Sequence, residues 1–252
     1  MHNYFDADPI AERYASARPA FHRHVMARLR ALLGSQLPLE RALDVACGTG
    51  HSTLCLEGLS PSVVGLDSSL SMLRRAPAGS HTMYVAGSAE DLPFRESGFD
   101  LLTVSSAFHW FDQDRFLREA TRVLRSGGTL VVYDNYFSGN AVETDAVAKW
   151  VFETYRSKYP GPPRAAVVFD TSGPANGFLC THREEYENIV PLSLQELTEY
   201  LLTQTNTIAA LEGGTPLPEL RQWLLEELRP YFEDGPLRVR FRGPIWILQR
   251  EA

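Results

Sequence analysis

Five short apolar runs, separated by segments with helical spacing, restrict the fold of this chain more than any other feature. The runs occupy residues 42–46, 63–66, 83–86, 101–104 and 129–133. Runs of this length bounded by turn residues are typical of buried strands. The alternation predicts a parallel sheet with helices on both faces, because parallel neighbours need a crossover connection. Ligands bind such sheets at the carboxyl ends of the strands, so we expect chemistry in the loops that follow them.

The alternation stops after Tyr133, and the rest of the chain has a different texture. Residues 137–182 contain several proline- and glycine-rich stretches and are expected to form a lid inserted after the fifth strand. A sixth strand, two helices and a seventh strand are expected at 185–191, 194–202, 217–228 and 237–249. The predicted fold is α/β, with a Rossmann-like, seven-stranded, mostly parallel sheet, helices on both faces and that lid.

Composition and charge narrow the classes of partner. The 252 residues are 44% hydrophobic and 22% charged, which are ordinary values for a chain that buries a core. The formal net charge is −7 and the basic residues do not cluster into a stripe. A nucleic-acid partner is therefore disfavoured, and a small or neutral ligand fits the charge better.

Cysteine usage and the lack of long apolar runs favour a reducing compartment. Cys47, Cys55 and Cys180 show no Cys-x-x-Cys spacing, so we expect neither a disulfide framework nor a zinc or other metal site. No run approaches the ~18 apolar residues of a membrane span, and the polar start lacks a signal-peptide pattern. A cytoplasmic protein without membrane contact is expected.

The clearest local motif is Leu43-Asp-Val-Ala-Cys-Gly-Thr-Gly50, where the first apolar run enters a glycine-containing turn before a helix. Glycine has no Cβ, so a ligand can approach the backbone closely there. Asp67 ends the second run, 23 residues beyond Asp44. In nucleotide-binding units an acidic residue at about this spacing accepts hydrogen bonds from both ribose hydroxyls. Taken alone, the glycine motif could be an ordinary tight turn and Asp67 a solvated aspartate. The spacing between the two favours a nucleoside-binding site.

The glycine pattern argues against a nicotinamide cofactor. A dinucleotide fingerprint needs a third glycine in Gly-x-Gly-x-x-Gly, whereas Gly48 and Gly50 are followed by His51, Ser52 and Thr53. No other phosphate-cradling run replaces it. An oxidoreductase is therefore the weaker reading.

Five segments in register, 43–50, 66–73, 87–94, 99–106 and 122–130, resemble the motifs of class I S-adenosylmethionine-dependent methyltransferases. The first reads Asp44, Ala46, Gly48, Gly50, with alanine in place of the first of three alternating glycines. The stretches 14–19 and 107–112 resemble the small-molecule branch that includes trans-aconitate methyltransferase-like proteins.

The resemblance implies S-adenosylmethionine as cofactor and assigns residues to it. Asp44, Ala46 and Gly48 would line its methionine part, and Asp67 would hold the ribose. Arg18 would meet the carboxylate, because a guanidinium can bind a carboxylate through two hydrogen bonds. The remaining implied cofactor residues are Tyr14, Ser68, Met72, Ser88, Ala89, Glu90 and Ser105.

Methyl transfer from a sulfonium is an in-line displacement that depends mainly on positioning and exclusion of water. A base is needed only if the acceptor holds a proton at its reacting atom. His109 follows the fourth strand and is the candidate base, with a packing or lining role as the alternative. The acceptor pocket is expected to include Trp110, Phe111 and Tyr136.

The predicted function is methyl transfer to an O, N or C atom of a small molecule, by a monomer or homodimer. The alternative is a catalytically inactive S-adenosylmethionine-binding regulator or assembly protein. The predicted organisation has an N-terminal segment with the cofactor-binding core at 1–136, the lid at 137–182, and completion of the core with further lid helices at 183–252. Gln204, Thr205 and Asn206 follow an apolar helical stretch and either face the pocket or serve as turn and cap residues.

Overall fold

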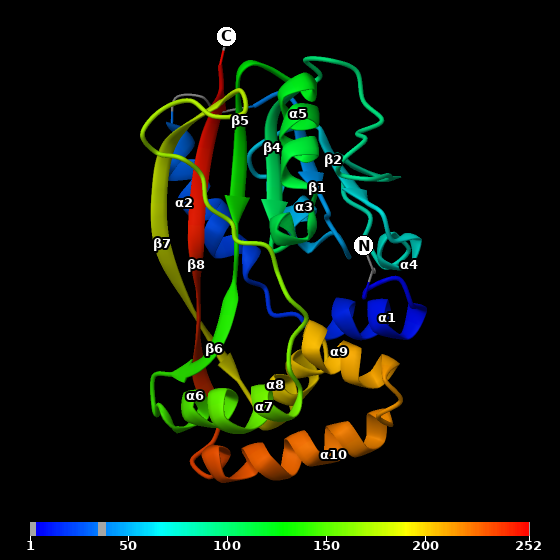
Figure 1. Cartoon of the computed structure of the whole chain (residues 1–252), viewed down its shortest axis with the longest axis vertical. Coiled ribbons are helices and arrows are strands. Elements are labelled where there is room, and N and C mark those ends of the chain that lie inside the picture. Colours follow the sequence, from blue (N-terminus) through cyan, green and yellow to red (C-terminus); the bar gives the residue numbers. More distant parts are fainter. Residues whose placement is uncertain (1–3, 35–38, 252) are drawn as a thin grey trace.

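The computed structural model describes residues 4–34 and 39–251, and its framework is one twisted, mixed sheet (Figure 1). Within this part of the chain the sheet has eight strands in the order β3-β2-β1-β4-β5-β8-β6, with β7 pairing on the other side of β8. Their bounds are β1 Ala42–Val45, β2 Val63–Asp67, β3 Thr82–Ala86, β4 Phe99–Ser105, β5 Leu124–Tyr133, β6 Tyr136–Ala141, β7 Phe178–Leu192 and β8 Leu237–Arg250.

The five strands of the first half are parallel, and β8 runs antiparallel to β5, β6 and β7. This confirms the predicted Rossmann-like architecture, with one strand more than the seven expected. The additional strand is β6, which continues the line of β5 and pairs with the first half of β8. The predicted sixth strand lies inside β7, which is far longer than expected and pairs along the whole of β8.

Helices cover both faces of the sheet and one end of it. Their bounds are α1 Asp8–Ala17, α2 His22–Leu33, α3 His51–Leu56, α4 Leu70–Leu73, η2 Phe108–Trp110, α5 Gln113–Val123, α6 Ala146–Trp150, η3 Val151–Tyr155, α7 Arg156–Lys158, α8 Leu194–Leu201, α9 Thr205–Glu212, α10 Leu217–Leu228 and η4 Arg229–Phe232. None of the described helices combines the length and the apolar composition that crossing a bilayer requires.

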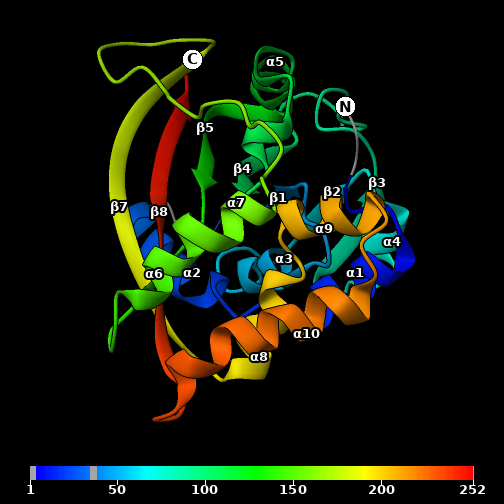
Figure 2. The same ribbon diagram turned by 60° about the horizontal axis from the view of Figure 1, so that its bottom comes forward.

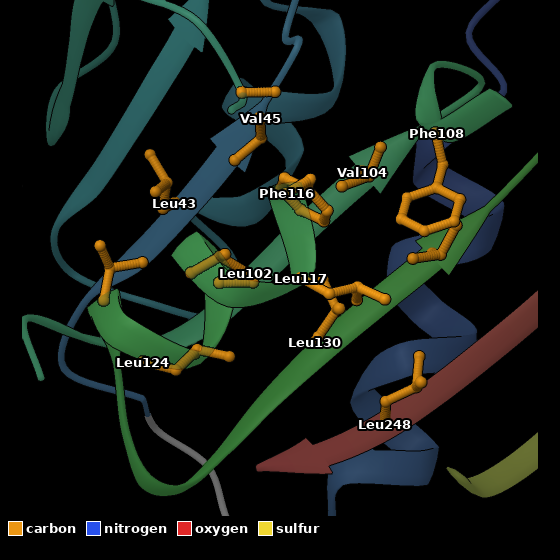
Figure 3. Packing of buried hydrophobic residues seen from close by; sticks show 14 of the residues in the cluster. Leu43, Val45, Leu102, Val104, Phe108, Phe116, Leu117, Leu124, Leu130 and Leu248 are labelled. Atoms are coloured by element: carbon orange, nitrogen blue, oxygen red, sulfur yellow. The ribbon is translucent and has the colours of Figure 1, made fainter. Parts of the chain in front are cut away.

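One face of the sheet is closed by α5, whose apolar residues recur at helical spacing (Figure 3). Phe116, Leu117, Ala120 and Val123 are buried against the central strands. The Asp112 side chain caps the helix by accepting a hydrogen bond from the backbone N–H of Arg115 at 3.1 Å. The opposite face is covered by α2 and α3, which pack with β5 and β8 in a second cluster.

A helical layer faces the carboxyl ends of the parallel strands (Figures 1 and 2). It is built from two separate stretches of chain, α6 to α7 and α8 to α10, packed in a third apolar cluster. Phe137 from β6 and Phe241 from β8 belong to the same cluster, so the layer is attached to the sheet by its antiparallel strands. The gap between this layer and the strand ends is where the rules of parallel sheets predict a ligand.

The first turn of α2 contains a histidine that should make the fold sensitive to acid. His22 shares a 2.9 Å hydrogen bond with the Tyr133 hydroxyl, and burial lowers its pKa from 6.5 to about 3, with the charges of His51 and Arg18 acting in the same direction. The unfolded chain binds this proton below pH 6.5, whereas the folded chain does not. Stability from the neutral imidazole is therefore present above pH 6.5 and lost as the pH falls below it.

We expect this one histidine to cost about 1–2 kcal/mol of unfolding free energy between pH 7 and pH 5. Urea unfolding at both pH values measures it, with His22→Gln as the comparison because glutamine can still hydrogen-bond to Tyr133. The variant should show a flatter decline than the wild type. Parallel declines would mean that His22 is not held neutral in the folded state.

Candidate cofactor and acceptor site

A cavity of about 1070 Å³ lies between the strand ends and the helical layer. Its walls come from α1, from the loops after β1, β2, β3, β4 and β5, and from the lid segments before and after β7. Drug-sized ligands occupy pockets of roughly 300–1,000 Å³. The cavity therefore has room for two small ligands side by side.

The glycine turn after β1 forms the floor at one end of the cavity. Ala46, Gly48 and Gly50 have φ angles of 56°, 54° and 75°, so three alternating residues adopt the left-handed conformation. A Cβ at Gly48 would meet no atom within 4 Å, since it would project into open space. Ala46 bears a cost of roughly 1–2 kcal/mol in this conformation, which explains why the resembled motif has glycine there.

Asp67 ties the glycine turn to the end of β2. Its Oδ2 accepts a hydrogen bond from the Gly48 N–H at 2.7 Å, and its Oδ1 accepts one from the Ser69 N–H at 2.8 Å. Burial raises the pKa of this carboxyl, while the backbone donors oppose the shift. Each oxygen keeps a further acceptor position, and the residue lines the cavity. This arrangement suits a pair of hydroxyl donors.

Asp44 lies behind the cavity wall instead of lining it. It is fully buried, and its carboxylate accepts hydrogen bonds from Ser52 and Thr53 at 2.5 and 2.7 Å and from Thr103 at 2.8 Å. Burial raises its pKa, and the hydroxyl donors act against that shift. The structure thus gives Asp44 a positioning role, because it joins β1, α3 and β4 beneath the turn that carries Gly48.

Arg18 enters the cavity from the end of α1. Its guanidinium lies 4.3 Å from the ring centroid of Tyr14 and 5.1 Å from that of Tyr200, and Nη2 donates to the Thr203 carbonyl at 3.2 Å. The buried Nε has no hydrogen-bond partner. A buried donor without a partner is costly, so this atom is suited to an anionic ligand group.

The other residues that the sequence assigned to the cofactor, apart from Asp44, also line the cavity. Glu90 is held in place, because it accepts hydrogen bonds from the Ser88 hydroxyl and from the Asp112 N–H at 2.5 and 3.1 Å. The lining includes Tyr14, Ala46, Ser68, Met72, Ser88, Ala89, Glu90 and Ser105. Twelve cofactor residues were predicted, and Asp44 alone among them does not reach the cavity surface.

His109 lies in η2, directly after β4, and lines the cavity although it is only 6% exposed. Its Nδ1 is 3.8 Å from Asp134 Oδ2, and its Nε2 has no hydrogen-bond partner. Burial lowers the pKa of His109 to about 4, and the positive charge of Arg164 acts in the same direction. The imidazole is therefore neutral at pH 7 and has a lone pair available.

The cavity lining also contains the three residues predicted for an acceptor pocket, Trp110, Phe111 and Tyr136, together with Gln204, Thr205 and Asn206. It also contains residues that the sequence analysis did not single out, namely Ser106, Asp134, Asn135 and Arg164. The rule that ligands bind at strand ends could have identified Asp134 and Asn135, because they directly follow β5. Arg164 lies in an irregular stretch and carried no such signal.

Among residues 4–34 and 39–251, no group of three His, Cys, Asp or Glu side chains is placed to hold a metal ion. The cavity brings together the carboxylate of Asp67, the partly buried guanidinium of Arg18 and several aromatic side chains, including that of Trp110.

Comparison with known proteins agrees with this geometry. Residues 43–132 match the methyltransferase domain family. A Dictyostelium discoideum protein named as a methyltransferase is 24% identical over 246 residues, covering 95% of this chain and 92% of its own. A demethylmenaquinone methyltransferase of Thermotoga maritima is 39% identical over 102 residues, which are 38% of this chain and 43% of that protein. A solved structure from Anaeromyxobacter dehalogenans, described as a type II methyltransferase, superposes with a TM-score of 0.68 at 23% identity, covering 93% and 97% of the two chains.

The fold is Rossmann-like and resembles that of the solved structure described as a methyltransferase. The match of residues 43–132 to the methyltransferase domain family extends this likeness from the fold to the sequence of the core strands and loops.

Proposed function

We propose that this protein binds S-adenosylmethionine in the cavity and transfers its methyl group to an O, N or C atom of a small molecule. The observation that carries the proposal is that one cavity joins the Gly48–Asp67 loops to the aromatic compartment around Trp110. In this proposal residues 1–136 bind the cofactor, and the segments 137–182 and 183–252 supply the acceptor compartment.

The chemistry of Asp67, Arg18 and Gly48 fits the cofactor. Asp67 has acceptor positions for two ribose hydroxyls, and Arg18 has a buried donor for a carboxylate. The open space beside Gly48 is a place where a ligand can approach the backbone and where any Cβ would intrude.

When bound, the cofactor supplies a methyl group on a sulfonium, and transfer forms a bond to the acceptor while the C–S bond breaks, leaving S-adenosylhomocysteine. The protein contributes position and exclusion of water. The α1 segment is attached to the core by the Ser69 hydroxyl, which donates to the Phe5 carbonyl at 3.1 Å, and by the Asp8–Arg75 ion pair at 3.5 Å. These contacts hold Tyr14 and Arg18 over the cavity.

His109 is proposed to accept a proton from acceptors that carry one at the reacting atom. Its neutral imidazole, next to Asp134, suits that role because the carboxylate can favour the imidazolium as it forms. An acceptor whose reacting atom carries no proton would not need this step.

Replacing His109 with alanine should lower turnover at least about ten-fold and leave S-adenosylhomocysteine affinity within about two-fold, given the usual contribution of a general base. Calorimetry measures affinity, and methylation of an acceptor found by screening measures turnover. Equal losses in both quantities would make His109 a lining residue. Because its pKa is about 4, wild-type turnover should stay flat between pH 6 and 8 where His109 limits it.

The experiment that tests the function is calorimetric titration with S-adenosylhomocysteine, with NAD titrated in parallel. Micromolar binding of the first and none of the second supports the proposal. Binding of NAD alone would reject it, because the glycine turn would then serve a dinucleotide.

The second candidate is a cofactor-binding regulator or assembly protein without catalysis. The relatives named for demethylmenaquinone match only 38% of this chain, so their acceptor is not transferred to it. An acceptor screen with labelled S-adenosylmethionine distinguishes the two candidates, because only an enzyme releases S-adenosylhomocysteine in step with a methylated product.

A further inference from the structure

Arg164 is an exposed residue of the lid segment that brings a positive charge to the lining of the cavity. Its Nη2 donates to the Thr205 hydroxyl at 2.8 Å, and its guanidinium lies 5.4 Å from the ring centroid of Trp110. Within the described part of the chain it forms no ion pair with an acidic side chain. Partial desolvation of the guanidinium lowers the pKa of this arginine, and the charges of Asp134 and Tyr136 oppose the shift.

The backbone around Arg164 is held on both sides. The Ala165 N–H donates to the His109 carbonyl at 3.3 Å, and the Gln113 side chain donates to the Ala166 carbonyl at 3.0 Å. The segment between α7 and β7 is thereby fastened to η2 and α5, elements of the core. These contacts and the hydrogen bond to Thr205 hold the Arg164 guanidinium at the cavity wall, where it can contact a bound ligand.

Two neighbouring side chains add donors without partners. Asn135 is 8% exposed, and its Nδ2 has no hydrogen-bond partner; Gln204 Nε2 is likewise buried without one. Both residues line the cavity. Buried donors are normally paired, so these two amide groups, which line the same cavity as Arg164, are complementary to an acceptor-only group, which is the character of an anion.

The acidic residue at this end is already engaged. Asp134 accepts hydrogen bonds from the side chains of Ser106 and Tyr136 and from the Asn135 N–H, and burial raises its pKa. A second arginine, Arg156, also lines the cavity, with its Nη2 donating to the Phe137 carbonyl at 3.3 Å. The acceptor end therefore has one positive charge in excess when Asp134 is ionised.

The rest of this compartment is aromatic. Trp110, Phe137, Phe152 and Tyr155 line it beside the two arginines. Such walls favour a flat, apolar body between them and leave the polar recognition to a few fixed groups.

We propose that the methyl acceptor has a planar, apolar body and one anionic group, and that Arg164 binds this group with Asn135 and Gln204. The inference rests on the proposed methyltransferase function and concerns recognition, not the atom that is methylated. Carboxylate and sulfonate share the required chemistry, because both present several acceptor oxygens to a guanidinium.

The test uses 2-naphthoate and its neutral isostere 2-naphthamide, titrated by calorimetry into the full-length protein saturated with S-adenosylhomocysteine. Saturation keeps Arg18 occupied, so that a second anion cannot bind there. Naphthalene-2-sulfonate is the third probe and separates a carboxylate preference from a sulfonate preference. The variants are Arg164→Gln, which removes the charge, and Arg229→Gln, an exposed matched control outside the cavity lining.

We expect the wild type and Arg229→Gln to bind one of the two anions at least about ten-fold more tightly than the amide, as one charge-assisted pair would give. Arg164→Gln should lose this preference while its affinities for the amide and for S-adenosylhomocysteine stay unchanged. Equal binding of anion and amide by the wild type, no binding of any probe, or an unchanged preference in Arg164→Gln would overturn the inference. Failure of the wild type to bind S-adenosylhomocysteine would instead reject the proposed function.

Discussion

Replacing Gly48 with valine should abolish binding of S-adenosylhomocysteine, reducing affinity by more than about 100-fold. The added side chain would enter the space that the backbone leaves open beside the cavity, since a Cβ at this position meets no atom within 4 Å. A β-branched residue at a φ of 54° also strains the turn, by roughly 1–2 kcal/mol or more. Calorimetry gives the affinity, and urea unfolding gives the stability.

A matched control separates the two effects of this substitution. Gly127 has a φ of 69° and likewise no neighbour within 4 Å of a built Cβ, but it does not line the cavity. Gly127→Val should therefore lose similar stability and keep its affinity. If Gly48→Val binds as the control does, the cofactor does not approach this turn and its placement is wrong.

Replacing Asp67 with alanine should weaken S-adenosylhomocysteine binding at least about ten-fold, because hydrogen bonds to a charged group contribute roughly 1.5–3 kcal/mol each. The substitution also frees the N–H groups of Gly48 and Ser69, which the carboxylate now holds. Part of the loss would then come from a looser glycine turn.

The isosteric variant Asp67→Asn distinguishes these contributions. Its amide keeps the size of the side chain and one acceptor oxygen, but its NH₂ group would face a backbone donor or a ribose hydroxyl. We expect affinity to fall for Asn as well as Ala. A competition assay with adenosine, which retains both ribose hydroxyls, should show the same losses. Unchanged affinity in both variants would remove Asp67 from the ribose site.

The core of the fold was predictable because its signals are local. The strands β1, β2 and β4 are short apolar runs, as strands buried on both faces must be, whereas β3 lies at the sheet edge and is only partly buried. The later strands lack that signal. Residues 136–141 read Tyr-Phe-Ser-Gly-Asn-Ala and form β6 because β8 is long enough to pair with them beyond the end of β5. The alternating burial along β7 reflects a strand at the sheet edge, whose polar residues hid most of its length.

The site residues likewise fall into those that sequence spacing predicted and those that only the packing revealed. The turn around Gly48 and the carboxylate of Asp67 come from consecutive strand-loop units, so their spacing along the chain already determined that they would meet at one strand end. The sequence also placed Asp44 in the same motif, but only the packing showed that three hydroxyls from α3 and β4 engage its carboxylate.

The sequence by itself therefore determined the parallel core, the glycine turn and the match of residues 43–132 to the methyltransferase domain family, because each depends on short-range patterns of apolar and glycine residues. Only the tertiary structure brought Arg164, Thr205 and Asp134 to the cavity that Trp110, Phe111 and Tyr136 also line. Arg164, Thr205 and Asp134 are far apart along the chain and meet because the helical layer is attached to the ends of β6, β7 and β8. Such contacts depend on the closure of long loops and the packing of whole elements, which leave no periodic signal in the residues themselves.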